Sequence, residues 1–333
     1  MRIVCFGSGA FGLPTFTRLA HDHDGAIVVS QPDRPKGRRR TLAPTPVACW
    51  AEASDLLTLK TSNVNEPDIA ARLRDIDADA WVVIAFGQKL GEPLLRDRFA
   101  INLHASLLPR WRGAAPINHA ILAGDRETGL SVIAVAQRMD AGDVLGQVRM
   151  AIGPADTAGN LHDALSLAGP DLVSRVLVEH SECSLAPAPQ DESRVTQAPK
   201  IHRCDAWINF HASSDECRRR IHAFSPAPGV SVELATSEGT IATLKLLRVE
   251  ARASDPQQRT GAAPGSLVDT ADGCVMCGGN RTIHLLDVQP AGGKPMTWSA
   301  FARGRSLQGA LTLRSVVAPP GSADEEPRGA KQC

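Results

Sequence analysis

The chain has 333 residues, a hydrophobic content of 43% and a formal net charge of zero. This length predicts about two domains. The balanced charge gives no overall sign of nucleic-acid binding, so any basic binding site must be local. No apolar run approaches the ~18 residues that a membrane span needs, so no membrane partner is expected.

The first half of the chain alternates short apolar runs with helical patterns. Strands are predicted at residues 2–6, 26–30, 81–86, 100–105 and 130–136. Helices are predicted at residues 66–76, 115–124 and 157–180, the last with Pro170 inside it. This alternation is typical of an α/β fold with a Rossmann-like, doubly wound parallel sheet.

The second half has a different pattern. Residues 182–201 are polar and rich in proline, which indicates a linker. A helix is predicted within residues 204–229, and the apolar runs that follow are spaced like the strands of a small, OB-like β-barrel. The chain end lacks periodicity and is expected to be a disordered tail. The predicted parts are an α/β domain at 1–181, the linker at 182–201, a C-terminal β-barrel domain at 202–314 and the tail at 315–333.

A glycine-rich loop follows the first predicted strand. Gly7, Gly9 and Gly12 form the pattern G-x-G-x-x-G, which is typical of dinucleotide-binding turns. Such a site also needs an acidic residue about 20 residues further on, at the end of the second strand. Ser30 and Gln31 stand there instead. We therefore expect a tight turn next to the substrate and no NAD site.

The eight cysteines are scattered, and no secretory signal precedes the first strand. This usage favours reduced thiols and a cytoplasmic location. Cys274 and Cys277 form the only C-x-x-C pattern, and a zinc site would need a second ligand pair at a matching spacing. The two cysteines lie in an apolar run between glycines, so we expect a short strand there and no metal.

The residues best suited to chemistry lie near the middle of the chain. Asn102 and His104 are two apart on a predicted strand, so their side chains share one face. Asp140 follows the next strand, and two neighbouring strands would bring its carboxylate beside His104. On the strand alone, His104 would equally suit a hydrogen-bonded core histidine. With the carboxylate added, the set suits acyl transfer, because amide and imidazolium hold a developing negative charge while imidazole moves protons.

The segment N-L-H-A-S-L-L-P-R-W-R-G-A-A-P-I, residues 102–117, resembles the signature of formyltransferases that use 10-formyltetrahydrofolate. The resemblance implies that Asn102, His104 and Asp140 are the catalytic residues and that the formyl donor contacts two loops. The donor-binding residues implied are Ser106, Leu107, Leu108, Pro109, Phe86, Gly87 and Leu90.

A basic loop bounded by Pro32 and Pro46 holds five cations and one acid. It resembles the loop that enters the acceptor stem of initiator tRNA in the family members that act on methionyl-tRNA. A proline-stiffened, cationic loop can neutralise phosphates while keeping its shape. The C-terminal domain is similar to the tRNA-contacting β-barrel of the same members. The tRNA-binding residues implied are Arg34, Lys36, Arg38, Arg39, Arg40, Arg218 and Arg219.

The resemblance thus predicts formyl transfer from 10-formyltetrahydrofolate to the α-amino group of initiator methionyl-tRNA, by a monomer without a metal. The chain departs from the family pattern at Ser8, Gly9, Val135 and Ala136, among other positions, and these departures concern the fit of the substrate. Three alternatives stay open: a formyltransferase acting on an amino-sugar nucleotide, a folate or tRNA binder without activity, and an NAD oxidoreductase.

Overall fold

The computed structural model describes residues 1–23, 26–37, 40–252, 261–279, 281–305, 307 and 309–318. Its backbone contacts divide the chain into two compact units. Unit 1 comprises Met1–Pro116, Glu127–Ala151 and His162–Ala198, and unit 2 comprises Ile117–Arg126, Ile152–Leu161 and the residues from Pro199 onward. Residues 182–198, within the predicted linker, therefore belong to unit 1. The domain boundaries given above stay a prediction.

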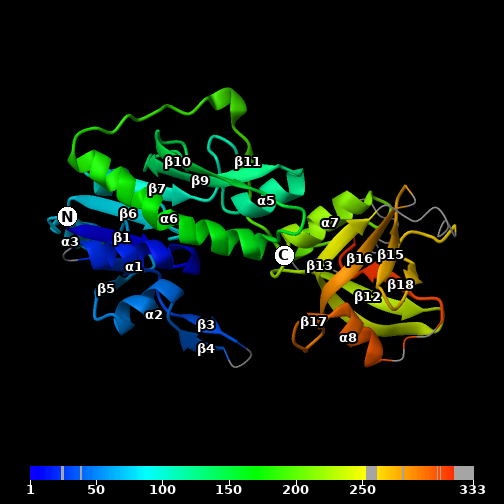
Figure 1. Cartoon of the computed structure of the whole chain (residues 1–333). Coiled ribbons are helices and arrows are strands. Elements are labelled where there is room, and N and C mark those ends of the chain that lie inside the picture. The colour runs from blue at the N-terminus through cyan, green and yellow to red at the C-terminus, as the bar shows by residue number, and fades with distance from the viewer. Residues whose placement is uncertain are drawn as a thin grey trace. The chain divides into compact units, whose positions relative to one another are not determined.

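Unit 1 is built on a seven-stranded sheet with the order β10-β9-β7-β6-β1-β2-β5 (Figure 1). The strands from β5 to β7 in this order are parallel. Strand β9 is antiparallel to β7, and β10 is antiparallel to β9. The strands are β1 Ile3–Gly7, β2 Ile27–Ser30, β5 Leu57–Lys60, β6 Ala80–Ile84, β7 Ala100–His104, β9 Glu127–Ala134 and β10 Val144–Ala151.

All five strands predicted for the first half are present, and the Rossmann-like fold is confirmed. The expectation of a parallel sheet holds for the five strands from β5 to β7 but is wrong for β9 and β10. A strand buried on both faces shows the same apolar run whichever way it points, so the sequence pattern could not reveal this direction.

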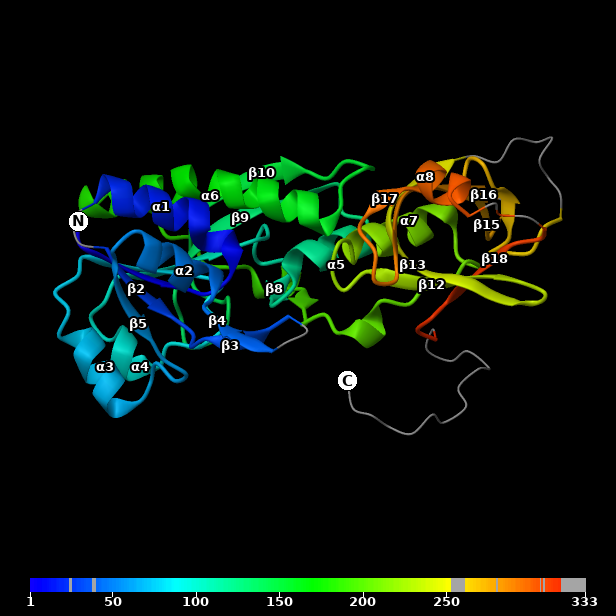
Figure 2. The same ribbon diagram turned by 90° about the horizontal axis from the view of Figure 1, so that it is seen from below.

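Helices cover both faces of this sheet. Figure 2 shows α1 and α6 on one face and α3 and α4 on the other. The helices predicted from periodicity are confirmed as α3, α5 and α6, and α6 continues through Pro170. Helices α5 and α6 each have residues in both units. The bounds are α1 Leu13–Asp22, α2 Pro46–Ala53, α3 Pro67–Arg74, α4 Glu92–Leu95, α5 Pro116–Ala123 and α6 Ala158–Ser181.

An aromatic cluster fixes the carboxyl end of β6. Phe6, Trp81 and Phe86 are buried, with ring centroids 5.1 Å apart for Phe6 and Trp81 and 5.6 Å apart for Phe6 and Phe86. Burial of large aromatic side chains is a major source of core stability. The packing of Phe86 on Phe6 therefore fixes the start of the segment that follows β6.

The glycine-rich loop is a tight turn, as expected. The N–H groups of Ser8 and Gly9 both donate to the carbonyl oxygen of Ala85, at 3.2 Å each. A Cβ atom on Gly7 would lie 2.3 Å from the ring of Phe16, so only glycine lets β1 and α1 pack this closely. Because these amides already have a protein acceptor, they are not presented to a dinucleotide phosphate.

Two short strand pairs and three 3-10 helices lie outside the two large sheets. The basic loop forms a hairpin of β3, Arg34–Lys36, and β4, Thr41–Ala43, while Arg38 and Arg39 lie outside the described residues. Strand β8, Arg112–Gly113, pairs in parallel with β11, Gln197–Ala198. The short 3-10 helices are η1 Ala10–Gly12, η2 Glu192–Arg194 and η3 Arg203–Asp205.

Unit 2 contains an antiparallel sheet with the order β14-β15-β16-β13-β12-β18, and β17 pairs with β16. Its edges meet, because the N–H of Leu267 donates to Leu311 and the N–H of Leu313 donates to Gly265, each at 2.8 Å. The predicted small β-barrel is therefore confirmed. Its elements are α7 Ser214–Ala223, β12 Val230–Thr236, β13 Gly239–Arg252, β14 Leu267–Asp269, β15 Cys274–Cys277, β16 Arg281–Pro290, β17 Met296–Thr297, α8 Trp298–Arg303 and β18 Thr312–Ser315.

The C-x-x-C pattern forms strand β15, as expected. Cys274 and Cys277 are buried and free, and their odd spacing on a strand directs the two side chains to opposite faces. Within the described residues, no group of three or more His, Cys, Asp or Glu side chains is arranged to hold a metal ion. In the same part of the chain, no helix is both long and apolar enough to span a membrane.

Candidate active site

The carboxyl end of β7 carries the predicted amide and imidazole. Asn102 and His104 alternate along the strand with Ile101 and Leu103, which are buried. The side chain of His104 is only 7% exposed, whereas Asn102 is half-buried. The strand period of two thus places both polar groups on one face, as the sequence predicted.

Asp140 reaches this face by a returning loop. Strand β9 ends at Ala134, which lies opposite Ile101 near the start of β7. Residues 135–143, here called the Asp140 loop, then fold back, and the N–H of Ala134 donates to the carbonyl of Asp143 at 2.9 Å. The expected closeness to His104 is present, but the route inferred for it, the carboxyl end of a neighbouring strand, is wrong because β9 is antiparallel.

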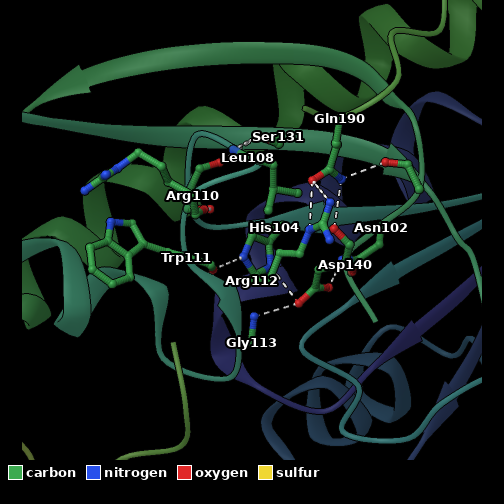
Figure 3. A network of polar contacts seen from close by, with 12 residues as sticks. Asn102, His104, Leu108, Arg110, Trp111, Arg112, Gly113, Ser131, Asp140 and Gln190 are labelled. Carbon is green, nitrogen blue, oxygen red and sulfur yellow. Dashed lines mark hydrogen bonds and ion pairs between the residues drawn. The ribbon is translucent and has the colours of Figure 1, made fainter. Parts of the chain in front are cut away.

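His104 faces an acceptor on each side (Figure 3). Its Nε2 lies 2.8 Å from the carbonyl oxygen of Trp111, and its Nδ1 lies 3.7 Å from Oδ2 of Asp140. A carbonyl can only accept, so Nε2 carries a hydrogen and donates it. The longer distance exceeds that of a hydrogen bond, and the contact is an ion pair only when both ring nitrogens carry a hydrogen. Nδ1 is therefore the ring nitrogen available for proton exchange.

The carboxylate of Asp140 is held by backbone and side chain together. Its Oδ2 accepts the N–H of Gly113 at 2.9 Å, and Nδ2 of Asn102 lies 3.5 Å from its Oδ1. Asp140 and Trp111 both have left-handed backbones, with φ of 53° and 63°. Such conformations cost about 1–3 kcal/mol each and concentrate at functional sites. Surrounding contacts must therefore hold this loop in place.

A buried cation lies close to the Asp140 loop and is linked to it through Gln190. The side chain of Arg112 is 3% exposed, and its Nε and Nη2 donate to Oε1 of Gln190 at 3.0 and 2.8 Å. Its Nη2 also donates to Glu192 at 2.9 Å. The Nε2 of Gln190 donates in turn to the carbonyl oxygens of Asp140 and Gly142, at 2.8 and 2.7 Å.

The acidic partner of this cation is tuned by its contacts. Hydrogen bonds from Arg112, and then from Arg138, lower the pKa of Glu192 to about 2. In the folded protein Glu192 is therefore ionised at neutral pH. Neither Arg112 nor Gln190 was predicted to belong to the site, because the residues next to a polar side chain in the sequence do not show whether it is buried.

The predicted folate-binding residues follow two adjacent parallel strands. Phe86, Gly87 and Leu90 come after β6, and residues 106–109 come after β7, so both segments lie at the sheet edge that carries His104. Phe86 and Leu90 are each 2% exposed. Their backbone, rather than their side chains, is therefore what a ligand would meet.

Polar side chains donate to, or accept from, the backbone of both segments, residues 86–90 and 106–109. Ser131 Oγ accepts the N–H of Leu108 and donates to the carbonyl of Ser106, while Gln147 Nε2 donates to the carbonyl of Leu108 at 2.9 Å. The hydroxyl of Ser8 donates to the carbonyl of Phe86 at 3.2 Å. Ser8, one of the departures from the family pattern, thus contacts the 86–90 segment.

The predicted tRNA-binding residues fall into two groups. Arg34 lies in β3 and donates to Gln31, and Arg40 is exposed with a left-handed backbone, φ 50°. In unit 2, Arg218 and Arg219 both pair with Asp215, at 2.6 and 3.2 Å. The remaining candidates are Lys36, whose backbone lies in β3, and Arg38 and Arg39, which are outside the described residues.

Comparison with known proteins identifies the family. The family model "Formyl transferase" matches residues 1–177, and the model "Formyl transferase, C-terminal domain" matches residues 200–306. A protein of Methylococcus capsulatus called methionyl-tRNA formyltransferase is 39% identical over 93% of this chain and 98% of its own length. A protein of Thiobacillus denitrificans with the same name is 38% identical over 94% and 99%. The chain therefore belongs to the formyl transferase family, and its full-length relatives place it among the methionyl-tRNA formyltransferases.

Solved structures share the fold at low sequence identity. HypX from Aquifex aeolicus, in complex with tetrahydrofolic acid, is 15% identical with a TM-score of 0.61, covering 93% of this chain and 48% of that chain. The N-formyltransferase from Helicobacter canadensis, in complex with folinic acid and dTDP-3-aminofucose, is 13% identical with a TM-score of 0.64, covering 86% and 98%. At these identities the likeness extends to the fold alone.

Proposed function

We propose that this chain transfers a formyl group from 10-formyltetrahydrofolate to the α-amino group of initiator methionyl-tRNA, with Asn102, His104 and Asp140 as the catalytic residues. The observation that carries the proposal is the convergence of these three side chains at the end of β7. It occurs in a chain whose full-length relatives bear the name of this activity.

The reaction exchanges one carbon–nitrogen bond for another. The neutral amine of the methionyl group attacks the formyl carbon, a new C–N bond forms, and the bond to the folate nitrogen breaks. An α-amine has a reference pKa near 8, so a usable fraction is neutral at pH 7 without a strong base. The site must therefore stabilise charge on the formyl oxygen and move one proton.

Asn102 and His104 suit the first task. Within the described part of the chain, the amide nitrogen of Asn102 makes one long contact, 3.5 Å, to Asp140, so its N–H groups can donate to the formyl oxygen. A positioned donor of this kind contributes on the order of 10²–10³ to the rate of acyl transfer. His104 adds positive charge when both of its nitrogens are protonated.

His104 and Asp140 suit the second task. Nδ1 of His104 can take the proton that the attacking amine loses and deliver it to the leaving folate nitrogen. Asp140 stabilises the charged ring during this transfer, because its Oδ2 lies 3.7 Å from Nδ1 and the side chain is only 12% exposed. The net result is one proton moved from amine to folate.

The binding of the two substrates is assigned to different surfaces. The folate would contact the backbone of residues 86–90 and 106–109, which flank the catalytic groups at the sheet edge. The tRNA phosphates would meet the basic loop between Pro32 and Pro46, whose cations outnumber its acids by four. The role of Arg218 and Arg219 toward tRNA stays a prediction, since both pair with Asp215 here.

The decisive experiment is formyl transfer from 10-formyltetrahydrofolate to charged initiator methionyl-tRNA, with charged elongator methionyl-tRNA as the control. We expect transfer to the initiator species alone. Transfer to neither, with the folate still bound, would move the acceptor to an amino sugar or another amine. Transfer to both equally would refute the assignment of initiator specificity.

A further inference from the structure

We propose that Gln190 is a positioning residue, which holds the Asp140 loop through backbone contacts and is itself oriented by Arg112. Residues 182–198, here called the strap, would then hold the Asp140 loop through Gln190 and would not be only a connection. This inference rests on the proposed role of Asp140, and its test includes a readout that does not need activity.

The neighbours of the Gln190 amide fix its orientation. The guanidinium of Arg112 has only donors, so the atom that faces it must be the amide oxygen. The carbonyls of Asp140 and Gly142 have only acceptors, so the atom that faces them must be the amide nitrogen. The side chain of Gln190 thereby bridges the buried guanidinium of Arg112 and the backbone of the Asp140 loop (Figure 3).

The two carbonyls lie where the loop is most constrained. Asp140 has a left-handed backbone, φ 53°, and a Cβ atom at Gly142 would lie 1.8 Å from the carbonyl oxygen of Ala134. A strained turn persists only when outside contacts define it. The two hydrogen bonds from Gln190 bracket this turn on either side of Ala141.

The strap is anchored on both sides of Gln190. Before it, Ala188 exchanges two backbone hydrogen bonds with Val144, at 2.8 and 2.9 Å. After it, the backbone of Thr196 accepts the N–H of Arg112 at 2.9 Å, and β11 pairs with β8. Gln190 is therefore presented to the loop from a fixed backbone.

Gln190 contacts Asp140 through the backbone carbonyl. Loss of this hydrogen bond should therefore change the orientation of the Asp140 carboxylate and leave the substrate contacts intact. A small displacement of a catalytic group costs rate far more than affinity. We therefore expect an effect on kcat with little effect on KM.

The test substitution is Gln190→Glu, with Gln197→Glu as the matched control on the same strap. The new carboxylate at 190 still accepts from Arg112, but it loses both donors and sets an oxygen against two carbonyl oxygens. Gln197 is exposed, so the same change there adds only the charge. We expect kcat of the 190 variant to fall on the order of 10-fold to 100-fold, with both KM values within about 2-fold and the control near wild type.

A double-mutant cycle separates positioning from a general loss of structure. If Gln190 acts through Asp140, Gln190→Glu should cause no further loss of kcat in an Asp140→Asn background. Losses that multiply, as for independent sites, would overturn the proposal.

Hydrogen exchange tests the strap without any substrate. The N–H of Gly113 donates to the carboxylate of Asp140, and that of Ala134 donates to the Asp143 carbonyl, so both amides report on the loop. We expect both to exchange about 10-fold faster or more in the 190 variant, or in Gln190→Ala if the first folds poorly. Unchanged exchange would refute the positioning role, whereas a wild type that transfers no formyl group would refute only the proposed function.

Discussion

Unit 1 buries the guanidinium of Arg112, unit 2 buries the imidazole of His222, and the two units accommodate these basic groups in opposite ways. Arginine keeps its proton in proteins, so unit 1 surrounds it with the amide oxygen of Gln190 and the carboxylate of Glu192. Histidine can lose its proton, and burial, followed by the charge of Arg218, lowers the pKa of His222 to about 4.

The difference shows what each buried group contributes. A buried charge demands partners with defined geometry, and those partners can then hold something else, as Gln190 holds the Asp140 loop. A buried neutral imidazole carries no charge to compensate: Nε2 of His222 accepts the N–H of Val249 at 3.1 Å, so the single hydrogen of the ring is on Nδ1. The first arrangement serves the active site, and the second serves the stability of the barrel unit.

The largest expected effect comes from removing the buried charge. Arg112→Met keeps most of the apolar stem but leaves Gln190 without its donor and Glu192 without its main partner. We expect the free energy of unfolding at pH 7 to fall by about 3 kcal/mol, measured by urea denaturation. The control is Arg138→Met, because Arg138 contacts the same carboxylate but is 68% exposed, and it should cost less than about 1 kcal/mol. Equal losses for the two variants would contradict the comparison.

The second effect is a pH dependence in unit 2. Because the folded pKa of His222 is lowered from 6.5 to about 4, the unfolded chain binds this proton first as the pH falls. Stability is therefore full above pH 6.5 and is lost between pH 6.5 and 4, by about 3 kcal/mol in total. The readout is the difference between wild type and His222→Gln, which cannot titrate. Parallel stability curves for the two proteins over this range would refute the neutral, buried state.

The third effect concerns the proposed catalytic residues. His104→Ala removes the imidazole that would stabilise charge and move the proton, so kcat for formyl transfer should fall about 10²-fold or more. His21→Ala is the control, because that side chain is 84% exposed at the end of α1. Wild-type turnover of the 104 variant would exclude His104 from the chemistry.

The smallest effect is expected from the cations of the basic loop between Pro32 and Pro46. Replacing Arg38, Arg39 and Arg40 together with Ala should raise KM for tRNA roughly 10-fold and weaken its salt dependence, while KM for folate stays unchanged. The control is the double variant of Arg72, in α3, and Arg96, directly after α4, which removes exposed positive charge away from the basic loop. A fall in folate binding with unaltered tRNA kinetics would show that the loop was assigned to the wrong substrate.

Local patterns predicted most of what is local in this structure. The alternation along residues 100–104 placed Asn102 and His104 on one face, and the short run C-V-M-C formed a strand with its cysteines on opposite faces. The cationic run at 218–220 is a case where composition alone was a weaker guide. Arg218 and Arg219 pair with Asp215, and Arg220 stacks over the ring of Trp207 at 3.4 Å.

The sequence by itself determined the family, the two kinds of sheet and the identity of the candidate catalytic residues, because side-chain periodicity and motif spacing are properties of neighbouring residues. Only the tertiary structure decided that β9 runs antiparallel, that Asp140 returns by a loop, and that Arg112 and Gln190 hold that loop. The direction of a strand and the burial of a polar side chain depend on contacts between residues far apart in the chain, such as the 78 positions between Arg112 and Gln190.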